Sequence, residues 1–145
     1  MIRAFIDASV LYAAACSSTG ASREIIRQAV RANVTLVSSE LVLAEVERNL
    51  AQDAPEALPA YELFLNTVPF ELVRPSKRQI SQAAQYTALK DAPIVAAAKR
   101  AQVDYLVSLD RRHLVGVLEV MQRSGLKILL PHQLLDEIRR QASTD

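Results

Sequence analysis

Short apolar runs alternate with longer helix-like segments along the whole chain, and this alternation limits the possible folds more than any other feature. It is typical of βαβ units built on a mainly parallel sheet, so we predict an α/β fold. The expected strands are residues 2–6, 34–37, 70–73, 105–107 and 127–130. The expected helices are residues 22–32, 39–52, 55–67, 76–89, 92–102 and 131–141, with another that begins near residue 9.

Serine and proline mark the starts of several of these helices. A serine side chain accepts a hydrogen bond from the first helical turn, and proline fits that turn because its missing N–H would have no partner there. Pro131 suits the first turn of the last helix, and segment 51–59, with two prolines, predicts an irregular joint between two helices. The serines that we expect as N-caps are Ser9, Ser22, Ser39 and Ser76.

The composition favours one compact domain in a reducing compartment. With 145 residues, 50% of them hydrophobic, the chain can bury a core without disulfides, and we expect a single domain over residues 1–145. Cys16 is the only cysteine, so no intrachain disulfide can form and the cytoplasm is the expected location. Asp7 interrupts the apolar N-terminal stretch, which argues against a signal sequence. No run approaches the roughly 18 apolar residues of a membrane span, so we expect no membrane partner.

Four acidic residues lie where an α/β sheet would present side chains for chemistry. Asp7 follows the first expected strand, and Asp110 closely follows the strand at 105–107. Asp91 opens the helix at 92–102, and Glu45 is the lone polar residue of the apolar stretch 41–46. Ligands of open α/β sheets bind outside the carboxyl ends of the strands. We therefore expect the four carboxylates to converge at that edge.

Each acid also has an ordinary structural explanation. Asp7 could be a turn residue after a strand that caps the next helix, Asp110 could be a turn residue after a strand, and Asp91 could simply cap the helix that follows it. Glu45 could lie on a partly exposed helix face and pair with Arg48 or Asn49. Taken one at a time, none of these residues establishes a site.

Together the four carboxylates favour a divalent cation. Clustered carboxylates repel one another unless a cation compensates their charge, and Mg²⁺ and Mn²⁺ suit oxygen ligands. His113 and His132 are the only histidines, so a histidine-rich zinc centre is not expected. Cations held in this way activate water and stabilise the leaving oxygen of a displacement reaction. We therefore predict a Mg²⁺- or Mn²⁺-dependent hydrolase with the four acids as metal ligands and catalytic residues.

Neighbouring residues have expected roles that follow from such a site. The Ser9 hydroxyl should steady the first acid, Ser108 should support the site in the same way, and His113 could assist Asp110. His132 should be exposed at the start of the last helix. Acids gathered around a cation leave the remaining surface basic, which suits a polyanionic substrate. The side chains expected to bind it are Lys99, Arg100, Arg111 and Arg112.

The order of these motifs resembles a known family. The segments are residues 5–11, the helix that holds Glu45, residues 90–98 and residues 104–110. Together they resemble a PIN domain from residue 1 to about residue 135, and residues 90–114 are the most specific part. The chain departs from the family where members often have Thr, Asn and a further acid, since it has Ala8, Ser9 and His113 at those positions.

The resemblance implies a Rossmann-like three-layer α/β/α PIN domain with a central, mainly parallel sheet. It implies a Mg²⁺- or Mn²⁺-dependent endoribonuclease whose site consists of the four acids named above. Many compact members are similar to VapC-type toxins of type II toxin-antitoxin systems. The expected partners are therefore an RNA substrate, a small cognate antitoxin protein and a second copy of the chain.

Two other functions remain open from the sequence. The first is a catalytically inactive PIN fold that binds RNA or a protein. The second is a phosphatase with Asp7 as its nucleophile, which is disfavoured because Ser9 stands where such enzymes have a second Asp. A dinucleotide-binding domain is not supported, because no Gly-rich phosphate loop follows any expected strand.

Overall fold

A five-stranded parallel sheet forms the centre of the computed structural model, which describes residues 1–144. Its strand order is β3-β2-β1-β4-β5, so the chain places its first strand in the middle. All five expected strands are confirmed, with boundaries that differ by a residue or two. The strands are β1 (Arg3–Ile6), β2 (Thr35–Ser38), β3 (Glu71–Leu72), β4 (Tyr105–Val107) and β5 (Ile128–Leu129).

The central strand β1 is apolar because both of its faces are covered. Phe5 lies opposite Val37 of β2 and Leu106 of β4, and all three side chains are buried. A continuous apolar run is what a strand buried on both faces requires, whereas a strand with one wet face alternates. The predicted α/β fold with a parallel sheet is therefore confirmed.

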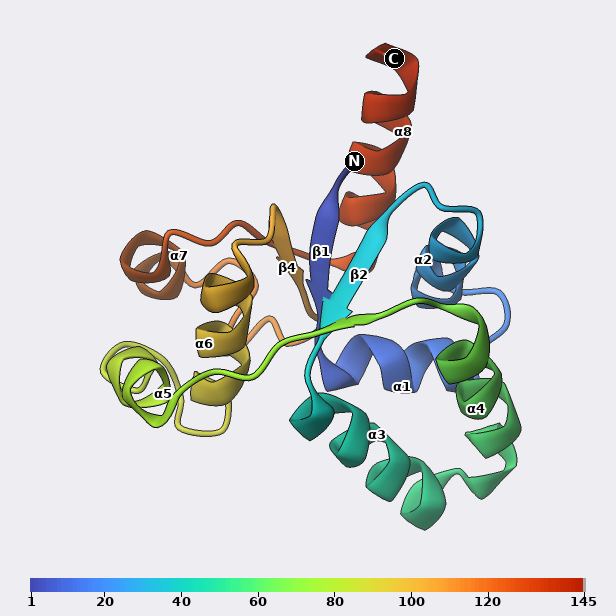
Figure 1. The fold of residues 1–145 in the computed structure, drawn as a ribbon, viewed down its shortest axis with the longest axis horizontal. Coiled ribbons are helices and arrows are strands. Elements are labelled where there is room, and N and C mark those ends of the chain that lie inside the picture. Colours follow the sequence, from blue (N-terminus) through green and yellow to red (C-terminus); the bar gives the residue numbers. More distant parts are fainter. Residues whose placement is uncertain (145) are drawn as a thin grey trace.

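Helices cover both faces of the sheet. Figure 1 shows α5, α6 and α7 on one side of the strands, and α1, α2 and α8 on the other. Helices α3 and α4 pack on α1 near the carboxyl ends of the strands. The three-layer α/β/α arrangement is confirmed. The helices are α1 (Ala8–Cys16), α2 (Ala21–Val30), α3 (Glu40–Asp53), the short 3₁₀ turn η1 (Pro55–Ala57), α4 (Leu58–Thr67), α5 (Lys77–Ala83), α6 (Ala92–Ala101), α7 (Leu118–Ser124) and α8 (Pro131–Thr144).

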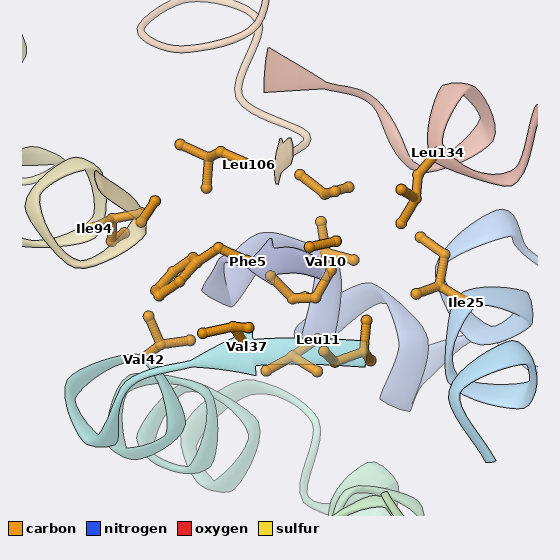
Figure 2. Packing of buried hydrophobic residues seen from close by; sticks show 14 of the residues in the cluster. Phe5, Val10, Leu11, Ile25, Val37, Val42, Ile94, Leu106 and Leu134 are labelled. Atoms are coloured by element: carbon orange, nitrogen blue, oxygen red, sulfur yellow. The ribbon is translucent and has the colours of Figure 1, made fainter. Parts of the chain in front are cut away.

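The hydrophobic core lies on both faces of the sheet and fixes the helices against it. In Figure 2, Ile94 of α6 lies on one side of β1, and Ile25 of α2 and Leu134 of α8 lie on the other. All three are less than 9% exposed. Burying an aliphatic side chain of this size contributes roughly 1.5–3 kcal/mol before entropy is counted. The core therefore holds rigidly the elements that carry the candidate site.

Two of the expected N-caps are wrong. The N-cap of α1 lies two residues earlier than expected, because Asp7 takes this position and accepts a hydrogen bond from the Val10 N–H at 3.3 Å. Ser9 lies inside the first turn. Helix α2 begins after Gly20, and Ser22 is buried within the helix instead of capping it. In both cases the helix begins before the serine that was expected to cap it.

The other expected helix starts are confirmed. Ser39 caps α3 by accepting from the Val42 N–H at 3.2 Å. Ser76 forms a capping box with Gln79 at the start of α5. Pro131 opens α8. These local signals depend only on a few neighbouring residues, which is why sequence alone predicts them.

Three helical segments differ in detail from expectation. Helix α5 ends at Ala83, and residues 84–90 form turns that lead into α6. The joint at 51–59 is confirmed as an irregular connection, made by the end of α3, the turn η1 and the start of α4. Helix α7 was not expected, because Val117 at its N-cap gives no side-chain cap signal and its Leu118 is exposed. No helix within residues 1–144 combines the length and apolar character needed to cross a membrane.

Candidate metal centre

The pairing of β1 with β4 brings two of the predicted acids to one edge of the sheet. Asp7 directly follows β1, and its backbone N–H donates to the Val107 carbonyl, the last residue of β4, at 3.2 Å. Asp110 follows β4 by three residues. Asp91 enters from the start of α6, and Glu45 lies in the middle of α3. Neighbouring strands and the helices beside them therefore place the four acids at the carboxyl edge.

The tightest group of possible ligands is formed by Asp91, Asp110 and His113. One ligand atom from each lies within 4.8 Å of the others. Asp7 and Glu45 lie outside this group, although the charge of Asp91 acts on Asp7 and the charge of Glu45 acts on Asp91. The structure thus brings together two of the predicted acids with one histidine, and places the other two acids nearby.

Asp91 is the least satisfied side chain of the site. It is only 6% exposed, and its Oδ2 atom has no hydrogen-bond partner among residues 1–144. It occupies the N-cap position of α6 but makes no side-chain cap hydrogen bond, so the explanation that it merely caps this helix is wrong. A buried polar atom without a partner costs about 1–3 kcal/mol, and a charged one costs more. A buried carboxylate oxygen with no partner fits a position that a hard cation would occupy.

Asp110 is held by four donors. Its Oδ1 accepts from the backbone N–H groups of Arg112 and His113, each at 3.0 Å. Its Oδ2 lies 3.1 Å from Nδ1 of His113 and 3.4 Å from Nζ of Lys90. Burial acts to raise the pKa of Asp110, but the hydrogen bonds from His113 and Lys90 outweigh it and hold the pKa below its ordinary value. The turn role of Asp110 is confirmed, and the residue stays ionised beside Asp91.

Asp7 is buried and connected to the β4 end by two serines. The Ser9 hydroxyl donates to Asp7 Oδ1 at 2.6 Å and accepts from the Leu109 N–H at 3.0 Å. Burial raises the pKa of the Asp7 carboxyl, and the charge of Asp91 adds to the rise; hydrogen bonds from Ser108, Ser9 and the Val10 N–H oppose it. The Ser108 hydroxyl also accepts from the Asp110 N–H at 3.0 Å. Both serines therefore contact the residues that they were expected to support.

The charges around Asp91 shift its pKa in opposite directions. Burial raises its pKa most, and the nearby carboxylates of Asp110 and Glu45 raise it further. Lys90 and His113 lower it. Without a cation, the folded chain therefore disfavours the charged form of Asp91, and a divalent cation would reverse this by attracting the carboxylate.

Glu45 is half-buried, as expected for a carboxylate in an apolar helical stretch. Within the part of the chain that the structure describes, it makes no ion pair with Arg48. The alternative that Glu45 is a simple surface ion pair is therefore not supported. Its place as a fourth ligand stays a prediction.

The expected substrate-binding side chains form two separate groups. Arg111 and Arg112 are exposed and directly follow Asp110. Lys99 and Arg100 are in the last turn of α6, roughly 12–14 Å along the helix axis from Asp91 at 1.5 Å per residue. Lys99 Nζ lies 5.9 Å from the centre of the Tyr86 ring. Only the first group therefore adjoins the candidate centre.

Lys90 was not assigned a role from the sequence, although its ammonium is the only lysine or arginine that pairs with a site acid within residues 1–144. The feature of the sequence that could have indicated this role is the position of Lys90 next to Asp91. His132 is exposed in the first turn of α8, as expected. Asp104 accepts a hydrogen bond from the Arg3 N–H at 2.8 Å at the opposite edge of the sheet.

We predict that Asp7→Asn stabilises the metal-free protein at pH 7. Because burial raises the pKa of Asp7, the stability associated with this group is present below the pKa of about 4 of an unfolded aspartate and is lost as pH rises through the folded pKa. Asn still caps α1 but carries no charge. In EDTA, the free energy of unfolding should rise by about 1 kcal/mol, which raises the melting temperature of a chain of this length by about 2–4 °C.

The gain from Asp7→Asn should shrink as the pH is lowered toward 4, because Asp7 of the parent protein then becomes protonated as well. Asp136→Asn is the matched control, since it removes only an exposed ion pair with Arg139. A melting temperature that is unchanged at pH 7, or a gain that does not depend on pH, would contradict this description of Asp7.

Comparisons with known proteins agree with this fold. The family model described as PIN domain matches residues 3–112, which include all four acids. No curated protein sequence gives a significant match. Solved structures are similar in fold at low sequence identity.

Three of these structures show the extent of the similarity. PAE2754 from Pyrobaculum aerophilum is 17% identical, with 96% of this chain and 90% of that chain covered and a TM-score of 0.64. VapBC2 from Rickettsia felis, bound to a promoter DNA fragment, is 13% identical, with 89% and 98% covered and a TM-score of 0.64. The Mycobacterium tuberculosis toxin VapC20, described as cleaving the sarcin-ricin loop, is 20% identical, with 75% and 91% covered and a TM-score of 0.50. Because the family model matches residues 3–112, which hold four of the five strands and all four acids, the chain belongs to the PIN domain family.

Proposed function

We propose that this PIN domain is an endoribonuclease that depends on Mg²⁺ or Mn²⁺. The observation that carries the proposal is the buried Oδ2 of Asp91, which has no hydrogen-bond partner among residues 1–144 and lies in a cluster with Asp110. A purely structural carboxylate would be paired or exposed. Asp7, Glu45, Asp91 and Asp110 are the proposed ligands.

The residues around the centre divide into those that bind the cation and those that position the ligands. Asp91 offers a free oxygen, and Asp110 offers Oδ2 once Lys90 moves aside, since the Lys90 side chain is 63% exposed and can turn into solvent. Ser9 and Ser108 hold Asp7 and the turn at Asp110 in a fixed relation. A bound divalent cation supplies Lewis-acid chemistry, since it makes water a better nucleophile near neutral pH and offsets charge that develops on a phosphodiester.

Lys90 has a second role in this proposal. In the structure it contributes positive charge beside Asp110 at 3.4 Å. When a cation takes over that charge balance, the ammonium becomes available to bind a phosphate of the substrate. Its position on the turn before Asp91 places it at the rim of the centre.

An RNA substrate is supported by the family and by one structural neighbour. VapC20 is described as a toxin that cleaves the sarcin-ricin loop, which is RNA. Arg111 and Arg112 are exposed beside Asp110 and suit phosphate contacts. Lys99 and Arg100 could contact only a more distant part of a longer strand.

A toxin role is the most specific setting that we propose. VapBC2, which is structurally similar, is described as bound to a DNA fragment from its promoter, and VapC20 is described as a toxin. The proposed partner is a small antitoxin protein, which could insert an arginine between the carboxylates, and a homodimer is proposed as well. Apolar surface for these partners is available at Tyr12 and Val115, which are half-buried, and at Leu118, which is exposed. Val10 and Leu114 belong to the core and offer no surface to a partner.

The two alternatives are weaker on particular observations. A phosphatase with Asp7 as nucleophile requires an accessible carboxylate, but Asp7 is 4% exposed and its Oδ1 accepts from the Ser9 hydroxyl and the Val10 N–H. An inactive binding module would have no use for the unpaired oxygen of Asp91, which costs stability. The activity assay below distinguishes this second alternative from the nuclease.

We predict that the protein cleaves RNA with Mg²⁺ or Mn²⁺ and that Asp91→Asn loses at least about a hundredfold in rate, the upper range of losses caused by changes around metal ligands. The amide keeps the size of the side chain but removes the charge that holds a hard cation. The measurement is cleavage of a labelled RNA under single-turnover conditions. Asp136→Asn, an exposed acid on α8, is the control and should cleave at the parental rate. Full activity in excess EDTA, or in Asp91→Asn, would reject the proposal.

We predict that phosphate contacts come mainly from the group beside Asp110. RNA affinity is measured at several salt concentrations in the Asp91→Asn background, where the RNA stays intact. Each lost contact to a single strand lowers the log-log salt slope by about 0.7, so Arg111→Ala together with Arg112→Ala should lower it by about 1.4. Lys99→Ala and Arg100→Ala test the distant group in the same way. A slope that a substitution leaves unchanged removes that residue from the interface.

We predict that the chain stops bacterial growth when it is expressed alone. Asp7→Asn and Asp91→Asn should abolish this toxicity, and co-expression of a small protein encoded beside the toxin gene should restore growth. The readout is colony count after induction, with soluble protein verified by blotting. Harmless expression of soluble wild-type protein would reject the toxin role and leave the nuclease proposal in place.

A further inference from the structure

The candidate centre contains a nitrogen donor among its carboxylates. We infer that His113 binds the cation through its imidazole and makes the site prefer Mn²⁺ to Mg²⁺. This inference rests on the proposed function, because it concerns the same cation. It adds a ligand and a metal preference that the four acids alone do not imply.

His113 is held in place by the residue that it would assist. Its backbone N–H donates to Asp110 Oδ1 at 3.0 Å, and its Nδ1 lies 3.1 Å from Asp110 Oδ2. Two contacts to one carboxylate fix both the turn and the direction of the ring. One ring nitrogen lies within 4.8 Å of a carboxylate oxygen of Asp91 and of Asp110. The imidazole is therefore positioned at the cluster before any cation arrives.

An independent observation points to a ligand at the same place. The Asp91 side chain is more than nine-tenths buried, and its Oδ2 has no partner within residues 1–144. None of its neighbours donates to that atom, although Lys90 and His113 both influence the Asp91 charge. The unpaired oxygen and the oriented imidazole belong to one cluster of three residues.

The ring chemistry indicates which cation this cluster would choose. With the ring proton on Nε2, the lone pair of His113 Nδ1 faces Asp110 Oδ2 at 3.1 Å, so one cation could contact both atoms. Imidazole nitrogen suits transition metals, whereas Mg²⁺ favours oxygen ligands and water. Mn²⁺ accepts both kinds of ligand. A mixed oxygen and nitrogen site therefore favours Mn²⁺.

His132 provides a matched control. It is exposed in the first turn of α8 and belongs to no group of metal-ligand side chains in the described chain. His113 and His132 are the only histidines, so a variant of either leaves one histidine in the protein.

The test is pulsed electron paramagnetic resonance of the full-length protein with Mn²⁺ as the probe. We expect nitrogen modulation from a directly bound imidazole, with the coupling changed when the chain is made with ¹⁵N-histidine. The modulation should persist in His132→Gln and disappear in His113→Gln. Because the isotope exchange is made in the parental protein, this readout does not depend on whether a variant folds.

The same protein is titrated with Mn²⁺ and Mg²⁺ by calorimetry. His113→Gln should weaken Mn²⁺ binding about tenfold, which is the size of loss usual around metal ligands, and weaken Mg²⁺ binding less. His113→Asp should shift the preference toward Mg²⁺ because it replaces nitrogen by oxygen.

Bound Mn²⁺ without histidine modulation in the parental protein would overturn the inference and leave the proposed nuclease intact. A protein that binds neither Mn²⁺ nor Mg²⁺ would overturn both. An equal loss of Mn²⁺ and Mg²⁺ affinity in His113→Gln would overturn the stated preference.

Discussion

The pairing of the central strand β1 with β4 is the constraint on which the candidate centre depends. It joins the N–H of Asp7 to the carbonyl of Val107 and so holds the residue after one strand beside the end of the other. The apolar residues of β1 keep this pairing buried, because helices cover both faces of the sheet. Asp7 is then buried along with the strand end, although a carboxylate gains nothing from burial itself. The core thus creates a position where a charge is costly unless something compensates it.

The compensation present in the chain is incomplete, and this is the physical basis of the proposed cation. Ser9 and Ser108 favour the ionised form of Asp7, and Lys90 with His113 favours that of Asp110. Burial nevertheless keeps the pKa values of Asp7 and Asp91 raised. A buried carboxylate that lacks full compensation costs stability, so stability alone does not explain these two aspartates. Ionisable groups whose pKa values are shifted by burial, and which lie together at one edge of a sheet, are typical of a functional site.

Much of the fold followed from local signals in the sequence, and what failed required knowledge of tertiary contacts. The apolar runs predicted every strand, and the Ser39 and Ser76 caps were correct because a cap involves only its own first turn. Ser9 failed as a cap because β1 ends so close to α1 that Asp7 takes that position. The four acids could be proposed from their places after strands and before helices. The contact of His113 with Asp110 could also be proposed, from their closeness in the sequence. The role of Lys90 could not, because it depends on how the turn at Asp110 folds back toward the start of α6.

The most direct test of the central claim is a crystal structure grown with saturating Mn²⁺, with anomalous scattering measured at the manganese absorption edge. The account predicts an anomalous peak in contact with Asp91 Oδ2 and an oxygen of Asp110, with the Lys90 ammonium displaced from Asp110. A carboxylate of Asp91 that contacts only water or protein at saturating Mn²⁺, with no anomalous peak at this edge of the sheet, would contradict it.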